Sequence, residues 1–365
     1  MTNFDYLPGM QKIESDILPK VHEYMRDFSS ENYTEEEVRA ALACPAPSIA
    51  NFSALLSPAA EPLLEEIARA AQTVTRRWHG NNVGLYTPLY LANYCDNHCA
   101  YCGFSCHKTI TRTKLSMHEL RQRAEEIAAS GLQEVLVLTG ESRSESSVEY
   151  IAQAITLLRD YFAVISIEIY PLNCDEYVQL QQVGADYVSV YQETYDPVLY
   201  DKLHLEGPKR CYTYRFYAQE RALLSGMRGV SFGALLGLGD WRRDIFAAGL
   251  HAYFTQRKHP QAEIAFSLPR MRPHSHVTER ELMQAMLALR LFMPHAGIAI
   301  STRERPQLRD AAVRVAATKM SAGVRTSVDE HNDPQFSIAD PRSVAEIHAM
   351  LRKNDLQPVY LDYIR

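Results

Sequence analysis

The sequence predicts an α/β protein whose strands form an eight-stranded (β/α) barrel, closed or nearly closed. Three observations support this fold class. Segments with the apolar or alternating pattern of strands are separated by amphipathic segments of helical periodicity. The two kinds alternate at roughly 30 residues per unit, which favours right-handed crossovers and a parallel sheet. Eight candidate strands occur, which is the number that closes a (β/α)8 barrel.

Residues 1–82 are expected to form a helical extension that precedes the barrel. Thr34 followed by Glu37 is a capping-box pattern, which predicts a helix over 35–42. A second helix is predicted over 58–80, where apolar residues recur at helical spacing and a glycine ends the pattern. We expect these helices to form a lid or collar beside the barrel.

The barrel itself is expected to span residues 83–320. Its candidate strands are 85–93, 134–140, 164–171, 186–193, 229–237, 263–269, 297–302 and, more weakly, 313–321. Its candidate helices are 116–130, 147–161, 174–184, 211–226, 240–257 and 278–292. Three of these helices end next to a glycine (Gly131, Gly184 or Gly226), which is typical of short loops that lead into a strand.

Residues 321–345 are polar and rich in turn-forming residues. A long segment without a strand or helix pattern in a barrel protein is typical of a loop over the mouth. We therefore expect residues 321–365 to form a C-terminal cover segment.

Composition and charge argue against several classes of protein. Apolar residues make up 46% of the chain and charged residues 22%, as in ordinary globular domains. The formal charge of −6 gives no reason to expect nucleic acid or an anionic membrane as the main partner. No apolar run approaches the roughly 18 residues that cross a bilayer. The N-terminus has neither a basic start nor an apolar core, so we expect no secretory signal.

The cysteines point to a metal centre. There are seven, an odd number, and Cys95, Cys99 and Cys102 lie within eight residues, directly after the first predicted strand. This usage predicts a reducing, cytoplasmic location and thiolate ligation of a metal, not a disulfide scaffold. Three thiolates on one short loop can hold three irons of a [4Fe-4S] cluster and leave the fourth iron open.

Spacing alone leaves alternatives to that cluster. A structural zinc ion could use the three thiolates with His98 or His107 as a fourth ligand, and three unrelated buried thiols are also compatible with the pattern. Cys106 is a poorer fourth ligand because it stands one turn further along the chain.

The cysteine loop resembles the signature of the radical S-adenosylmethionine superfamily, C-x3-C-x-aromatic-C, with Tyr101 as the aromatic residue. In that family the open iron binds the amine and carboxylate of S-adenosylmethionine, and one electron then releases a 5′-deoxyadenosyl radical. The resemblance therefore implies a [4Fe-4S] cluster and S-adenosylmethionine as cofactors, and a flavodoxin- or ferredoxin-type electron donor as a partner.

Polar residues at the predicted strand ends also indicate an active site. In a (β/α)8 barrel the functional side chains lie at the C-terminal ends of the strands. The residues found there are Gly140, Glu141, Glu168, Gln192, Glu193, Gly237, Asp240, Arg270, Arg272, Ser301 and Arg303. Their convergence predicts one charged rim on an otherwise apolar barrel.

The resemblance assigns cofactor contacts to part of this rim. Gly140 and Glu141 stand where the family has its G-G-E motif, with Thr139 in place of the first glycine, and imply a contact to the methionyl ammonium. Glu168 is expected to bind the ribose hydroxyls. Arg215 is expected to bind the methionyl carboxylate.

A glycine-containing stretch after the fifth predicted strand resembles the segment that packs on adenine in the family. It contributes Gly233, Leu235 and Gly237. Without the resemblance, Glu168 could equally be a salt-bridged strand residue and Arg215 a charge on a helix surface.

Several segments match, in order, the aromatic amino-acid lyases of this superfamily. They are 93–105, 138–142, 192–195, 267–273, 301–304 and 320–323. The match runs from about residue 60 to the C-terminus and is similar above all to the tyrosine lyases that make 2-iminoacetate. No cysteine follows Cys211, which removes the second cluster of the hydrogenase maturases in this group. Two stretches depart from the lyase pattern, 326–332 and 358–363.

This resemblance implies a carbon–carbon lyase that cleaves the Cα–Cβ bond of tyrosine to 2-iminoacetate (dehydroglycine) and p-cresol, for thiamine thiazole biosynthesis. The 5′-deoxyadenosyl radical is expected to take a hydrogen atom from the substrate amine before the bond breaks. Arg303 is expected to pair with the α-carboxylate, because a guanidinium suits bidentate binding, and Ser301 to add a hydrogen bond. Gln192 and Glu193 are expected to line the polar wall around the amine or phenol.

Other functions remain open from sequence. A related lyase could act on tryptophan or another amino acid, and a non-catalytic iron–sulfur electron carrier or a zinc-binding scaffold could use the same thiols. A thiazole synthase is a further candidate partner of a lyase in this pathway.

Overall fold

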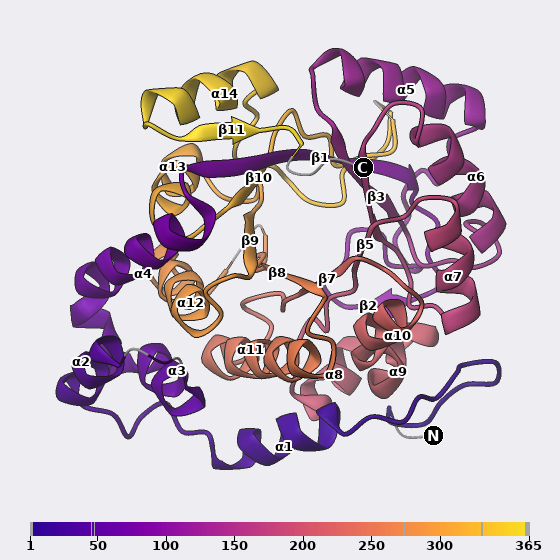
Figure 1. Cartoon of the computed structure of the whole chain (residues 1–365). Coiled ribbons are helices and arrows are strands. Elements are labelled where there is room, and N and C mark those ends of the chain that lie inside the picture. Colours follow the sequence, from indigo (N-terminus) through magenta and orange to yellow (C-terminus); the bar gives the residue numbers. More distant parts are fainter. Residues whose placement is uncertain (1–2, 45, 47, 273–274, 330, 362–365) are drawn as a thin grey trace.

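Eight parallel strands close a barrel in the computed structural model, with helices around the outside (Figure 1). The structure describes residues 3–361 except 45, 47, 273–274 and 330. The barrel strands are β1 (Asn82–Ala92), β3 (Glu134–Thr139), β4 (Val164–Glu168), β5 (Tyr187–Ser189), β7 (Gly229–Phe232), β8 (Glu263–Ser267), β9 (Gly297–Ile300) and β10 (Lys319–Ser321). Pairing of β10 with β1 closes the ring, which confirms the predicted (β/α)8 fold class.

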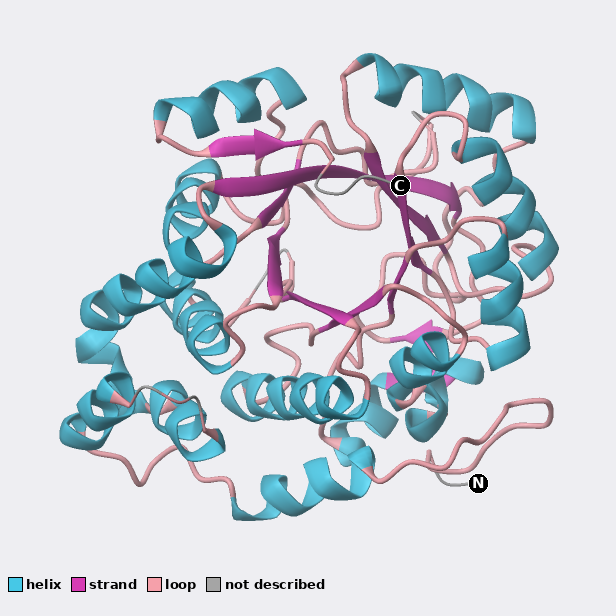
Figure 2. Cartoon of the chain, in the orientation of Figure 1, coloured by secondary structure: helices cyan, strands magenta, loops and turns pink. Residues whose placement is uncertain are grey.

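A helical layer surrounds the barrel, as Figure 2 shows by the helices outside the ring of strands. Its members are α5 (Met117–Ala129), α6 (Val148–Leu158), α7 (Cys174–Gln182), α8 (Pro197–Leu203), α9 (Tyr212–Phe216), α10 (Ala218–Leu224), α11 (Trp241–Lys258), α12 (Glu279–Phe292) and α13 (Pro306–Val315). Ser116 with Glu119 and Thr278 with Glu281 form capping boxes that start α5 and α12.

Several predicted barrel elements need correction. The strands expected over 186–193 and 229–237 end four and five residues earlier, at Ser189 and Phe232. The strand expected over 313–321 is shorter, because residues 313–315 are the last turn of α13. Pro306 starts that helix, and Leu308 and Ala312 bury one face of it four residues apart. The single helix expected over 211–226 is two short helices, α9 and α10, separated at Tyr217.

The N-terminal extension packs on the outside of the barrel. It consists of α1 (Ile17–Asp27), α2 (Glu35–Ala43), α3 (Ile49–Leu56), η1 (Pro58–Leu63) and α4 (Leu64–His79). The capping box of Thr34 and Glu37 forms as expected. The predicted 58–80 helix begins with the 3-10 turn η1, which contains Pro62.

Aromatic packing attaches this extension to the barrel helices. Phe52 of α3 is fully buried and stacks on Phe292 of α12, with ring centroids 4.3 Å apart. A Cβ atom at Gly249 of α11 would lie 2.5 Å from the Phe52 ring, so glycine is needed for this close approach. The extension is therefore a collar, and none of its described residues lines the central cavity.

The C-terminal segment crosses the mouth and then returns to the outer layer. Residues 322–343 contain no described helix or strand, as expected for a cover loop. After it, a capping box of Ser343 and Glu346 starts α14 (Val344–Lys353), which leads to strand β11 (Gln357–Val359). β11 pairs with the first residues of β1 outside the closed ring. No helix in the described part of the chain has the length and apolar character needed to cross a membrane.

Candidate functional site

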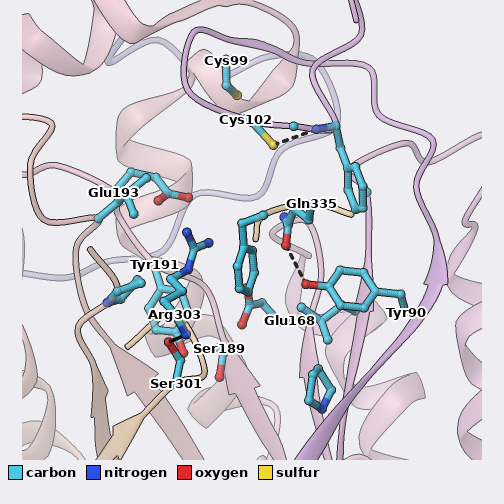
Figure 3. A pocket seen from close by; sticks show the side chains of 18 of the residues that line it. Tyr90, Cys99, Cys102, Glu168, Ser189, Tyr191, Glu193, Ser301, Arg303 and Gln335 are labelled. Atoms are coloured by element: carbon cyan, nitrogen blue, oxygen red, sulfur yellow. Dashed lines mark hydrogen bonds between the residues drawn. The ribbon is translucent and has the colours of Figure 1, made fainter. Parts of the chain in front are cut away.

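A cavity of about 400 Å³ opens at the C-terminal ends of the barrel strands. Its wall combines strand-end residues, the cysteine loop after β1 and the cover loop (Figure 3). Of the predicted site residues, it brings together Cys95, Cys99, Tyr101, Cys102, Gly140, Glu141, Glu168, Glu193, Arg215, Leu235, Arg272, Ser301 and Arg303.

The three cysteines lie on a loop held in place by backbone hydrogen bonds. The amide of Asp96 donates to the carbonyl of Glu141 at 3.0 Å, and the amide of Ala100 donates to that of Leu203 at 2.9 Å. Two N–H groups point at sulfur: Asn97 Nδ2 lies 3.8 Å from Cys95 Sγ, and Phe104 N lies 3.3 Å from Cys102 Sγ. Cys106 is exposed and does not line the cavity.

These thiols fit an iron–sulfur cluster better than a single ion. In the described part of the chain, the side chains that converge tightly enough for one ion do not include these cysteines. Burial raises the pKa of Cys95 to about 11 and of Cys99 to about 12, so the sulfur atoms need a cation beside them to be thiolates. The N–H···S hydrogen bonds are contacts that stabilise cluster thiolates. A [4Fe-4S] cluster would be held here by Cys95, Cys99 and Cys102.

Four charged side chains form a buried network beside the cysteines, which we call the charge quartet: Glu141, Glu193, Lys209 and Arg215. Arg215 lies 2.9 Å from Glu141 and 3.5 Å from Glu193. Lys209 Nζ lies 2.8 Å from Glu193 and 3.6 Å from Glu141. Burial opposes ionisation of both carboxyl groups, but the two cations outweigh it and lower the pKa of each.

Tyr101 is positioned by a buried histidine. Its hydroxyl lies 2.8 Å from His204 Nε2, while His204 Nδ1 lies 2.7 Å from the carbonyl of Tyr200. A carbonyl only accepts, so Nδ1 carries the proton and Nε2 accepts from Tyr101. Burial lowers the pKa of His204 to about 3, which keeps this tautomer neutral.

Arg303 and Glu168 lie in a part of the cavity where charges are not paired. The Arg303 guanidinium carbon is 3.6 Å from the centre of the Phe336 ring and makes no ion pair with a carboxylate among the described residues. The Arg303 amide donates to Ser301 Oγ at 3.3 Å. Burial, with a smaller contribution from Glu193, raises the pKa of Glu168 to about 7.

Five of the predicted residues do not line the cavity: Gln192, Gly233, Gly237, Asp240 and Arg270. The Gln192 side chain is buried behind it and donates to the carbonyl of Tyr212 at 3.4 Å, so a direct substrate contact by Gln192 does not fit the structure. Gly233 is needed for packing, because a Cβ atom there would lie 2.0 Å from the carbonyl oxygen of Ser267. Gly237 adopts φ +106°, a backbone conformation that favours glycine, and it also lies outside the wall.

Two arginines of the predicted rim, Arg270 and Arg272, form ion pairs with a carboxylate of the protein. Arg270 pairs with the buried Glu304, its Nε lying 2.9 Å from Oε1. Arg272 lies 3.3 Å from the same carboxylate. Both arginines therefore contact a carboxylate, unlike Arg303, although the single charge of Glu304 balances only one of their two charges.

Some residues of the cavity wall come from segments without a periodic sequence pattern and are not predicted. Lys209 lies in the short 3-10 helix η2 (Pro208–Arg210) that follows strand β6 (His204–Glu206), and only its tertiary position shows a role. Gln335 and Phe336 reach the cavity from the cover loop, where Gln335 Oε1 accepts from the Tyr90 hydroxyl at 2.7 Å (Figure 3). The polar character of the loop predicts a cover but not these individual contacts.

Comparison with known proteins agrees with this site. Residues 89–246 match the Radical SAM superfamily, and residues 267–357 match the Biotin and Thiamin Synthesis associated domain. The 2-iminoacetate synthase of Escherichia coli (strain K12) is 36% identical over 326 residues, which is 86% of each chain. The 3-methylornithine synthase of Methanosarcina acetivorans is 28% identical over 193 residues, 52% of this chain and 54% of that one.

Solved structures show the same architecture. The structure of HydG, a maturase of the [FeFe]-hydrogenase, superposes with a TM-score of 0.87 at 27% identity, covering 95% of this chain and 81% of that one. Methylornithine synthase (PylB) superposes with a TM-score of 0.71 at 20% identity, covering 88% and 97%, and shows the shared fold. The resemblance inferred from the cysteine loop and the strand-end segments is confirmed, with the [4Fe-4S] cluster and S-adenosylmethionine as the family's cofactors. The chain belongs to the 2-iminoacetate synthase family of radical S-adenosylmethionine enzymes.

Proposed function

We propose that this protein is a lyase that cleaves the Cα–Cβ bond of tyrosine to 2-iminoacetate and p-cresol, supplying 2-iminoacetate for thiazole formation. The observation that carries the proposal is the half-buried guanidinium of Arg303, which has no carboxylate partner among the described residues and lies in the same cavity as the cysteine loop. A charge that is partly removed from water raises the free energy of the protein unless a group of opposite charge pairs with it. An amino-acid α-carboxylate is such a group.

Arg303 binds and orients the substrate in this proposal. Its planar guanidinium can donate two parallel hydrogen bonds to a carboxylate, which fixes direction as well as position. The ring of Phe336 lies against the guanidinium and holds it by a cation–π contact at 3.6 Å. Ser301 supplies a hydroxyl on the same part of the wall.

The charge quartet suits a zwitterionic cofactor. Its two anions and two cations sum to zero, and the methionyl group of S-adenosylmethionine adds one ammonium and one carboxylate, so the local charge stays balanced. Glu141 is assigned to the ammonium and Arg215 to the carboxylate, and Glu168 is assigned to the ribose hydroxyls. Bound there, the cluster and S-adenosylmethionine supply the 5′-deoxyadenosyl radical, and the protein supplies orientation and protection.

The cover loop forms part of the cavity wall and is expected to shield it from water. Gln335 bonds Tyr90, and its backbone carbonyl packs so close to Gly103 that a Cβ atom there would lie 2.5 Å away. This contact places the loop against the residue that follows Cys102. A closed cavity protects a reactive radical from competing hydrogen donors.

Anaerobic turnover tests the proposal. The reconstituted protein, reduced by dithionite and supplied with S-adenosylmethionine and tyrosine, is expected to form p-cresol and glyoxylate, the hydrolysis product of 2-iminoacetate. Chromatographic quantification of both products gives the result, with tryptophan as the parallel substrate. Consumption of neither amino acid while S-adenosylmethionine is still cleaved would overturn the tyrosine lyase assignment.

Cysteine variants separate the cluster ligands from the other thiols. Cys99→Ala is expected to abolish cleavage of S-adenosylmethionine, because it removes a ligand of the cluster. Cys106→Ala is the matched control and is expected to retain cleavage, since that thiol is exposed and outside the cavity. The electron for turnover is assigned to a flavodoxin- or ferredoxin-type donor, and the product to a thiazole synthase.

A further inference from the structure

Two histidines and a glutamate converge on the cysteine loop but outside the cavity wall: His98, His107 and Glu206. One ligand atom from each lies within 4.8 Å of the other two. His98 is half-buried, and the other two are exposed, so the group is open to solvent. Neither the cluster nor the proposed lyase reaction uses these side chains.

The fold brings the three residues together from separate parts of the chain. β2 (His98–Cys99) pairs antiparallel with β6, and His98 stands directly opposite Glu206 in that ladder. His107 reaches the same place because the amide of Cys106 donates to the carbonyl of Asn97 at 3.0 Å, which folds the end of the cysteine loop back over its start.

The side chains face one another. His107 Nε2 lies 3.1 Å from Glu206 Oε2, and His98 Nδ1 lies 3.9 Å from Glu206 Oε1. The two imidazole rings are tilted by 48°, with centroids 4.2 Å apart. Once the facing imidazole nitrogens carry no proton, the two rings and the carboxylate can offer three lone pairs to a common point.

This donor set suits a borderline divalent transition-metal ion. Zn²⁺ takes imidazole nitrogen and carboxylate oxygen at about 2.0–2.2 Å, so tetrahedral ligands lie roughly 3.4 Å apart. The ligand atoms lie up to 4.8 Å apart, so the widest pair must approach by about 1.4 Å, which the exposed side chains of His107 and Glu206 can provide. Ca²⁺ and Mg²⁺ are poorer candidates because they prefer oxygen ligands.

We propose that His98, His107 and Glu206 bind one Zn²⁺ ion, with water completing the coordination. This site is separate from the three cluster cysteines, which face the cavity. The ion would tie the cysteine loop to β6, whose first residue, His204, positions Tyr101. Its expected effect is to stabilise the loop that carries the cluster.

Zinc titration of the anaerobic, cluster-loaded enzyme tests the site. The wild type is expected to bind one Zn²⁺ per chain without loss of iron, measured by calorimetry and metal analysis, and to unfold at a higher temperature with Zn²⁺ than without. His107→Gln and Glu206→Gln are each expected to weaken binding at least tenfold and to abolish the thermal shift. Iron content, checked in each variant, separates this effect from damage to the cluster.

Two matched variants complete the test. His118→Gln removes an exposed imidazole from α5, and Cys106→Ser removes the thiol beside His107; both are expected to bind Zn²⁺ as the wild type does. The proposal is overturned if the wild type binds no stoichiometric Zn²⁺, or if neither His107→Gln nor Glu206→Gln changes the affinity. It is also overturned if Cys106→Ser alone removes binding, because the ligand would then be that thiol.

Discussion

The two halves of the cavity handle buried charge in opposite ways. Beside the cysteines, the charge quartet pairs each carboxylate with both cations at distances from 2.8 to 3.6 Å. Across the cavity, Arg303 is stacked on Phe336, and Glu168 makes no side-chain hydrogen bond among the described residues. The half with the charge quartet, which we call the paired half, is organised before any ligand binds. The half with Arg303 and Glu168, which we call the open half, has charged groups that can still pair with a ligand.

The energetic reason lies in desolvation. Burying a charge costs free energy that only close, well-oriented partners return. In the quartet, the ion pairs between its own members offset the desolvation free energy. The pKa values of Glu141 and Glu193 are therefore lowered, although burial alone would raise them. In the open half burial dominates, so the pKa of Glu168 rises to about 7 and that of Arg303 falls.

Breaking the quartet is expected to have the largest effect on stability. Arg215→Gln leaves two carboxylates with one cation, and removing one member of a buried pair costs about 3–5 kcal/mol of unfolding free energy. Adding Glu141→Gln restores neutrality and is expected to return part of that loss, although S-adenosylmethionine binding stays weak. Urea denaturation of both variants makes the measurement. A double variant as unstable as Arg215→Gln would contradict charge balance as the cause.

Glu168 gives the open half a distinctive pH dependence. The folded chain retains a proton on Glu168 up to about pH 7, whereas the unfolded chain releases it near the ordinary glutamate value. The contribution of Glu168 to stability is therefore full at low pH and is lost as pH rises toward 7, by roughly 3 kcal/mol in total. The unfolding free energy of the wild type relative to that of Glu168→Gln is therefore expected to fall as the pH is raised from 5 to 8.

Asp244 is the matched control for this experiment. Burial raises its pKa to about 7 as well, but it sits on α11 and accepts from Thr194 and the Tyr195 amide, away from the cavity. Asp244→Asn is expected to alter the pH profile of stability with the same sign while S-adenosylmethionine affinity stays unchanged. If the unfolding free energies of the wild type and Glu168→Gln changed with pH in parallel, Glu168 would not have the raised pKa on which this prediction rests.

Arg303→Lys tests whether the open half recognises a carboxylate. The charge remains, but the fork of parallel donors is lost, and a charged hydrogen bond is worth about 1.5–3 kcal/mol. We expect kcat/KM for tyrosine to fall roughly 10- to 100-fold, with iron content and S-adenosylmethionine binding preserved. Arg305→Lys, in an exposed pair with Glu279, should turn over normally. Equal losses in both variants would argue against a substrate contact by Arg303.

Phe336→Leu is expected to produce the smallest change. It removes the ring face under the guanidinium, and a cation–π contact contributes about 0.5–2 kcal/mol. The KM for tyrosine should rise a few-fold, and Phe336→Tyr, which keeps a ring, should restore it. If the two variants behave alike, the ring serves only to fill space.

The sequence by itself determined the fold class and the place of the three cysteines on one short loop. Strand and helix periods alternate strongly enough to predict a parallel barrel, because one face of each element must be buried. Cys95, Cys99 and Cys102 are close in sequence, so a short loop brings them together whatever the rest of the chain does. Arg303 and Glu168 follow from their strand-end positions, since parallel strands end on one side of a barrel.

Only the tertiary structure decided which polar residues share the cavity and which of them are already paired. Lys209 comes from the short 3-10 helix η2 and Gln335 from the cover loop, neither of which has a periodic sequence pattern. Their contacts depend on which distant segments the fold brings together. Gln192 and Glu193 are adjacent, yet only Glu193 lines the cavity, and it does so from a backbone turn with φ +70° that strand alternation does not anticipate. Pairing between charges depends on distance in space, and sequence spacing reports that distance only for neighbours on the same element.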